Sequence, residues 1–279
     1  MRKPRGRNVR KAILAAWLTT GLLISGYGFL LSGCAPVLPA QKSIVDVGQI
    51  HSLEMAERAW QTARVAEYGP IWIAENKLDG DRFTAGLVAT QLASVTGDTA
   101  WSNVAIKIFN DVLEQAPDLT HARAWRGLAH ALLARDFPVQ GLWQIVPGPG
   151  FVRLHHVRAS FRDLDKAIAA APHDPVIRLI RASTYLGLPS IFGGRKEGLA
   201  DFNLLHDWVT APEGNPEYVD LLQSKIWQEE YYLARATMMT RIGKATEVAG
   251  LWEHLGAVTD NPLLRELAKW HLTSIGTSQ

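Results

Sequence analysis

Apolar and small side chains recur at helical spacing along most of the chain, and prolines interrupt the pattern at intervals. Near the middle, Ser160, Leu164 and Ala167 fall at i, i+4 and i+7, which places them on one stripe of a helix. Pro172 and Pro175 end that helix and begin the next, because proline lacks the N–H of a helix interior but fits a first turn. The pattern predicts an all-α chain built from helix pairs.

The same spacing returns in four segments, 86–119, 122–174, 175–214 and 231–264. The first has small or apolar residues at its seventh, eighth, twentieth, twenty-fourth and thirty-second places: Leu92, Ala93, Ala105, Phe109 and Pro117. The second begins with Trp125, Leu128 and Ala129 at the fourth, seventh and eighth places. This interval resembles the tetratricopeptide repeat (TPR) family, whose units are helix–turn–helix pairs of 34 residues.

The resemblance implies a right-handed α-α superhelix (a TPR-like solenoid) over residues 42–272, followed by a tail at 273–279. In the third segment, Ala182 and Tyr185 match the first helix, whereas Ala200, Leu204 and Pro212 match the second. The fourth segment is degenerate, with Met238 where the family has a small residue, as expected of a capping repeat. A helix at 42–68 is expected to pack on the first repeat, and residues 218–241 are expected to form one long helix.

Two insertions lengthen the second and third segments, and both fall at the turn inside a helix pair. The first is centred on 136–152, whose prolines and glycines are expected to prevent a continuous helix, and the second on 187–195. Their apolar residues are candidates for partner binding: Leu142, Trp143, Ile145, Val146, Leu188, Ile191 and Phe192. Exposed apolar loops mark interaction sites, but such a loop can also fold back as a lid on the core.

A second candidate surface lies on the first helix of the second repeat. By resemblance to the family, Arg123, Arg126 and His130 line the concave groove, where they form a cationic stripe suited to a partner carboxylate. The alternative is that acids on neighbouring helices neutralise the stripe.

The first 33 residues have the features of a secretory signal. Six bases and no acid occupy the first eleven positions, and an apolar run follows at 12–31. Leu31, Ser32, Gly33 and Cys34 then match the motif before the acylated cysteine of bacterial lipoproteins, and Cys34 is the only cysteine. Lipidation at Cys34 with a tether at 34–41 is therefore expected; an uncleaved transmembrane helix is the alternative.

Removal of this signal reverses the sign of the net charge. The remaining chain has 23 bases against 27 acids, a net charge of −4, which argues against a nucleic-acid partner. Ala35, rather than an acid, follows Cys34. By resemblance to enterobacterial sorting, this favours an outer-membrane, periplasm-facing location over the inner membrane.

The sequence contains none of the common catalytic or cofactor motifs. His155 and His156 are adjacent, so on a helix they point about 100° apart and cannot easily share a metal ion. We therefore expect no metal site, no cofactor and no enzymatic activity.

Two functions fit these observations. The first is a membrane-anchored scaffold or adaptor that binds an envelope protein or peptide. The second is a small-molecule-binding accessory of a transporter, similar in layout to the helical lipoprotein component of TRAP transporters. A closed apolar pocket between helices would favour the second, and an open groove the first.

Overall fold

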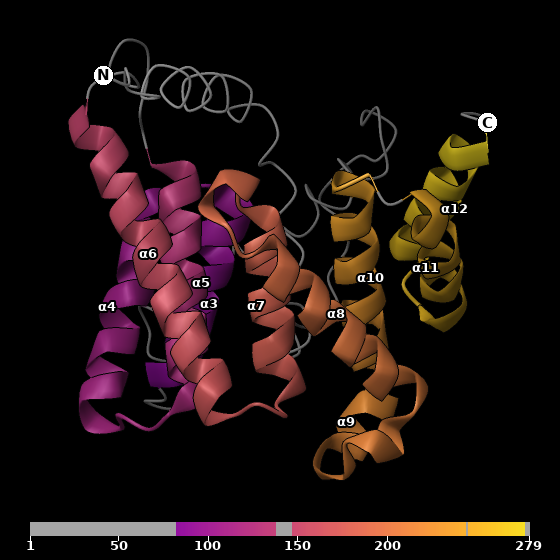
Figure 1. Ribbon diagram of the computed structural model, residues 1–279, viewed down its shortest axis with the longest axis horizontal. Helices are drawn as coiled ribbons and strands as arrows, with labels where there is room; N and C mark the ends of the chain where they lie inside the picture. The colour runs from indigo at the N-terminus through magenta and orange to yellow at the C-terminus, as the bar shows by residue number, and fades with distance from the viewer. Residues whose placement is uncertain (1–81, 138–146, 244, 277–279) are drawn as a thin grey trace, which may run out of the picture.

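The computed structural model describes residues 82–137, 147–243 and 245–276. These residues form α-helices, short 3-10 helices and loops, with no β-strand among them. The all-α prediction is confirmed for this part of the chain. Figure 1 shows most helices standing side by side in a row, with α8 running obliquely and α9 at the lower edge, and the chain advances from α3 and α4 at one end to α12 at the other.

The helices follow one another as antiparallel pairs. The four pairs are α3 (Arg82–Thr96) with α4 (Thr99–Gln115), α5 (Thr120–Asp136) with α6 (Pro147–Ala170), α7 (Pro175–Gly187) with α8 (Arg195–Thr210), and α10 (Lys225–Arg241) with α11 (Ala245–Val258). The helix α12 (Pro262–Gly276) packs on α11. Shorter elements join the pairs: η3 (Ser190–Phe192), η4 (Pro212–Gly214), η5 (Pro216–Tyr218) and α9 (Val219–Gln223).

Successive pairs pack side by side. The first helix of each pair contacts the first helix of the next: α3 contacts α5, α5 contacts α7, and α7 contacts α10. In Figure 1 the α7–α8 turn lies at the upper edge of the row, and the α4–α5 and α6–α7 connections lie at the lower edge. The two kinds of turn therefore occupy opposite edges of the molecule.

Side-chain caps and prolines set where the helices begin. The Asp98 carboxylate accepts one hydrogen bond, from the N–H of Ala100 at the start of α4, and Asp174 accepts two, from the N–H groups of Val176 and Ile177 at the start of α7. The boundary predicted from Pro172 and Pro175 is confirmed, because α6 ends at Ala170 and α7 begins at Pro175.

Small residues allow the helices of a pair to cross closely, although not always at the predicted positions. A Cβ added at Gly127 would lie 2.9 Å from Leu164 Cγ, and one at Gly198 would lie 3.1 Å from the Ala182 carbonyl oxygen. Ala182 and Ala200 both match small-residue places of the family, which face the neighbouring helix; Ala182 is fully buried, but Ala200 is exposed, so the match at Ala200 does not mark a packed position. The packed face of α8 instead carries Gly198, Phe202 and Leu205.

Two predicted boundaries are also wrong. Residues 218–241 do not form one helix, because Ser224 has an extended backbone (φ −66°, ψ 138°) and its hydroxyl accepts from the Trp227 N–H to cap α10. The prolines and glycines of 147–150 do not prevent helix formation, because α6 begins at Pro147 and a first helical turn tolerates proline.

Several predictions fall outside the described residues: the signal at 1–33, Cys34, the tether at 34–41, the helix at 42–68 and residues 277–279 of the tail. Among the helices that are described, none has the length and apolar character needed to cross a membrane.

Candidate functional site

Arg126, the middle residue of the predicted cationic stripe, forms a bidentate ion pair with Asp163. Its Nε donates to Asp163 Oδ2 at 2.7 Å and its Nη2 donates to Asp163 Oδ1 at 2.9 Å. Its Nη1 donates to the side-chain oxygen of Asn110 at 2.9 Å. Since the Asp163 carboxylate is buried, this pairing is of the strong bidentate kind. The acid on α6 therefore neutralises Arg126, as the alternative interpretation of the stripe expects.

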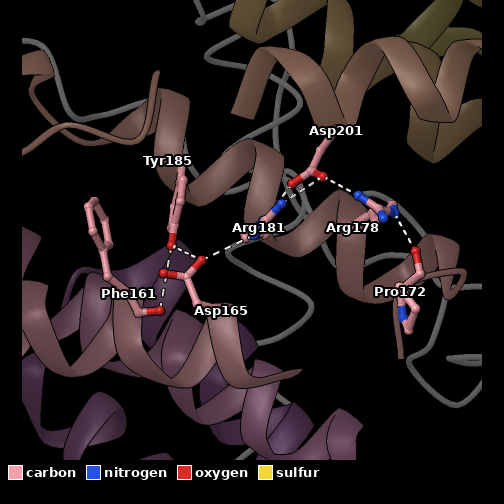
Figure 2. A network of polar contacts seen from close by, with 7 residues as sticks. All are labelled: Phe161, Asp165, Pro172, Arg178, Arg181, Tyr185 and Asp201. Atoms are coloured by element: carbon pink, nitrogen blue, oxygen red, sulfur yellow. Dashed lines mark hydrogen bonds and ion pairs between the residues drawn. The ribbon is translucent and has the colours of Figure 1, made fainter. Parts of the chain in front are cut away.

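Arg181 repeats this arrangement one helix pair further along. Its Nε and Nη2 donate to the two carboxylate oxygens of Asp201 at 2.7 and 2.9 Å, and its Nη1 donates to Asp165 at 3.1 Å. Figure 2 shows this guanidinium between the carboxylates of Asp165 on α6 and Asp201 on α8. Arg181 thus joins the second helix of its own pair to the second helix of the preceding pair.

Arg235 on α10 occupies the corresponding place at the next junction, with longer contacts. Its Nη2 lies 3.4 Å from the Asn203 side-chain oxygen on α8 and 3.8 Å from Glu247 Oε2 on α11. Its Nη1 donates to the Phe202 carbonyl oxygen and to the Tyr231 hydroxyl. We call Arg126, Arg181 and Arg235 the bridging arginines. Each lies on the first helix of a pair and contacts both the second helix of the same pair and the second helix of the preceding pair.

The remaining contacts in Figure 2 extend the junction around Arg181. Arg178 Nη1 donates to Asp201 Oδ1 at 2.5 Å, so the buried Asp201 carboxylate faces two guanidinium groups. The Tyr185 hydroxyl donates to Asp165 at 2.6 Å. Burial, together with the neighbouring Asp165, raises the pKa of Tyr185, so its hydroxyl keeps its proton and remains a donor.

His130, the third residue of the stripe, is paired with another histidine. Its Nδ1 lies 3.0 Å from Nδ1 of His156 on α6, and the two rings are stacked. Burial is the main cause that lowers the pKa of His130 to about 4, and the nearby His156 lowers it further. At neutral pH His130 therefore adds no charge to the stripe.

Arg123, the first residue of the stripe, interacts with the preceding turn. Its Nη2 donates to the Pro117 carbonyl oxygen at 2.7 Å, and within the described residues it has no ion-pair partner. Arg178 makes the equivalent bond to the Pro172 carbonyl oxygen, also at 2.7 Å. In both cases the guanidinium holds the turn that precedes its own helix. The predicted stripe thus contains one cation, Arg123, without an acidic partner.

The predicted insertion edge is described only in part. Leu142, Trp143, Ile145 and Val146 lie outside the described residues. In the α7–α8 turn, Leu188 and Phe192 are partly buried, whereas Ile191 is 51% exposed. The positive φ angles of Gly193 (81°) and Gly194 (82°) form the end of this turn. A Cβ at Gly194 would lie 2.8 Å from Tyr185 Cδ2, so the turn packs tightly on α7.

One exposed surface was not predicted from the sequence. On α6 the outer face carries Phe151, Val152, His155, Arg158, Arg162 and Lys166, all of which are exposed. The positions 151, 155, 158, 162 and 166 follow the period of a helix, and this signal is present in the sequence. It was missed because the prolines at 147 and 149 indicated a loop where α6 begins.

No group of three or more histidine, cysteine, aspartate or glutamate side chains that could hold a metal ion occurs in the described part of the chain. Arg126 and Arg181, the bridging arginines with acidic partners at hydrogen-bond distance, form their ion pairs between helices. Comparison with protein-family models, with curated proteins and with solved structures found no match to this chain.

Proposed function

We propose that the protein is a membrane-anchored, non-enzymatic scaffold of the cell envelope, built from TPR-like helix pairs in a right-handed superhelix and attached through a lipid on Cys34. In this proposal it faces the periplasm, from the outer rather than the inner membrane, and binds a protein or peptide.

The regular contacts between helix pairs support a repeat architecture. First helices contact first helices along the row, and the bridging arginines stand at consecutive junctions at 126, 181 and 235. Repeat proteins stack units through such nearest-neighbour contacts, and the stack offers an extended surface to a partner.

The exposure of Ile191 carries the binding part of the proposal. This apolar side chain is presented by a short 3-10 helix between Leu188 and Phe192, in a turn that Gly194 packs against Tyr185. A side chain held in this way loses little conformational entropy on binding. The partner therefore binds at the edge where the α7–α8 turn lies, and Ile191 is its principal described contact.

The bridging contacts leave a smaller binding role for the α5 stripe. Arg126 and His130 interact with α6, so a partner carboxylate would have to displace Asp163 or His156 to reach them. Arg123 is the one residue of the stripe that can offer a charge without displacing an acid. We therefore assign Arg126 and His130 to the packing of the helix pair.

Comparative affinity capture from envelope extracts tests the proposal. Ile191→Asp should lower the recovery of the specific partner about tenfold or more, since a buried anchor side chain contributes at least this much to binding. The control is Leu119→Asp, because Leu119 is also exposed (36%) but lies in the α4–α5 connection at the opposite edge. If both variants retain, or both lose, the same proteins, the α7–α8 turn is not the binding site.

A further inference from the structure

The outer face of α6 carries three bases that form no ion pair with any acid in the described part of the chain. Arg158, Arg162 and Lys166 lie four residues apart, one turn after another, and all three are exposed. None of them has an ion-pair partner among the described residues. We call these three residues the basic stripe of α6.

The two acids of α6 bind residues outside this stripe. Asp163 is buried against Arg126, and Asp165 binds Arg181 and Tyr185. The other base of the helix, Arg153, donates to the carbonyl oxygens of Ala134 and Arg135 at the end of α5, so it fixes the helix rather than extending the stripe. The stripe is a local positive surface in a chain whose net charge after residue 33 is −4.

Exposed apolar side chains continue the stripe toward the beginning of the helix. Phe151 is 66% exposed and Val152 is 39% exposed. From position 151 to position 166, a helix rises about 22 Å, at about 1.5 Å per residue. Figure 1 shows the first turns of α6 projecting beyond the upper ends of the neighbouring helices. The face therefore combines an apolar tip with a row of cations on one rigid helix.

We propose that the outer face of α6 docks on the surface of an anionic phospholipid membrane. Phe151 and Val152 enter the boundary between headgroups and acyl chains, and Arg158, Arg162 and Lys166 contact lipid phosphates. Helices that bind membrane surfaces combine these two features, an apolar part and cations near the headgroups. An acidic protein or a nucleic acid would also attract the bases, but the exposed valine beside the phenylalanine favours a hydrocarbon boundary.

This docking is independent of the proposed protein partner and of the lipid on Cys34. It would hold the row of helices in a fixed orientation at the membrane, with α6 against the lipid. The partner-binding turn at Ile191 and the basic stripe belong to different elements, so each can be altered without the other.

A fluorescent probe on α6 tests the proposal in the full chain. Cys34→Ser removes the only native cysteine, and His155→Cys then places an environment-sensitive dye, such as acrylodan, between Phe151 and the basic stripe. Phosphatidylcholine vesicles that contain phosphatidylglycerol should shift the dye emission to the blue, and pure phosphatidylcholine vesicles should do so weakly. The same dye at Glu253→Cys, an exposed position on α11, should not shift. Tethering through residues 12–31 alone would depend little on phosphatidylglycerol and would not favour position 155 over position 253, so it can be told apart from docking of α6.

Charge reversal supplies the decisive comparison. The double variant with Arg158→Glu and Arg162→Glu should need at least about ten times more vesicle lipid to reach the same emission shift at position 155. Each base near an anionic surface contributes to binding, and each added acid opposes it. High salt should similarly weaken the shift of the labelled chain that keeps Arg158 and Arg162. Arg158→Gln with Arg162→Gln should give a smaller loss, and thermal unfolding should confirm that both pairs of variants remain folded.

The control is Lys225→Glu with Lys269→Glu, which makes the same charge change at exposed positions on α10 and α12. These variants should keep the shift. An equal loss in the control and in the stripe variants would overturn the proposal, since it would show a response to net charge alone. A shift produced by soluble polyglutamate or by DNA, but not by the vesicles, would also overturn it.

Discussion

Arg126 of α5 and Asp163 of α6 are joined by two hydrogen bonds, from Nε at 2.7 Å and from Nη2 at 2.9 Å, with the carboxylate almost fully buried. The pair lies where the sequence predicts a cationic groove. The Arg126 guanidinium, which was expected to face a partner, instead binds α5 to α6 within the helix pair.

Loss of the Asp163 carboxylate should therefore destabilise the fold. Asp163→Ala leaves the Arg126 guanidinium partly buried without its counter-charge, and we expect the free energy of unfolding to fall by about 3 kcal/mol, the usual cost of breaking a buried pair. The matched control is Lys166→Ala on the same helix, which removes an exposed charge and should change stability by no more than about 0.5 kcal/mol. Urea unfolding of both variants measures the difference, and equal midpoints would show that the pair adds no stability.

The close crossing at Gly127 gives a second expectation. A methyl group there would lie 2.9 Å from Leu164 Cγ and 3.2 Å from the Ser160 carbonyl oxygen, so Gly127→Ala forces α5 and α6 apart and should cost about 1–3 kcal/mol.

Gly250→Ala is the control for that substitution. Gly250 also lies within a helix, α11, but a Cβ there meets no atom within 4 Å. Alanine has the higher helix propensity, so Gly250→Ala should raise stability by about 0.5–1 kcal/mol. Thermal or urea unfolding measures the change in the free energy of unfolding for each variant. A loss for Gly127→Ala and a gain for Gly250→Ala would agree with the close crossing, whereas a stabilising Gly127→Ala would contradict it.

The sequence predicts the helices well because the signals that define them are local. Pro172 and Pro175 act within a few residues of their own positions, and α6 ends at Ala170 while α7 begins at Pro175. Ala200 fails for a different reason: its small size fits the family pattern, but which face of α8 is buried depends on how α7 and α8 are rotated. Gly198 and Phe202, two residues away, occupy the face that packs.

The candidate site depends on tertiary contacts to a greater extent. Arg126 and Asp163 are 37 positions apart, and Arg235 and Asn203 are 32 apart, so no sequence spacing reveals that they meet. The exposure of Phe151 could have been anticipated from its helical spacing with Arg158, had α6 been expected to begin at Pro147. Prolines in a first helical turn resemble loop prolines in sequence, and this ambiguity concealed the surface.

The lipid anchor proposed at Cys34 predicts a specific modification. Wild-type protein expressed in a bacterium should incorporate a labelled fatty acid and fractionate with membranes. Cys34→Ser should abolish the labelling, because Cys34 is the only thiol in the chain. If the wild-type protein incorporated no fatty acid and kept residues 1–33 in the membrane fraction, the apolar segment at 12–31 would be acting as an uncleaved anchor, which is the alternative interpretation of the sequence.

The His130–His156 pair should make stability depend on pH. The pKa of His130 is about 4 in the folded chain against an ordinary value of 6.5, and burial lowers the pKa of His156 in the same direction. Between pH 6.5 and about 4 the unfolded chain therefore binds more protons, so the stability present above pH 6.5 is lost as the pH falls through this window. His121 acts oppositely, because its bond to Asp174 raises its pKa and stabilises the fold at lower pH. His130→Asn should flatten the decline in urea-unfolding free energy between pH 7 and pH 4.5, whereas an unchanged decline would assign the loss to other groups.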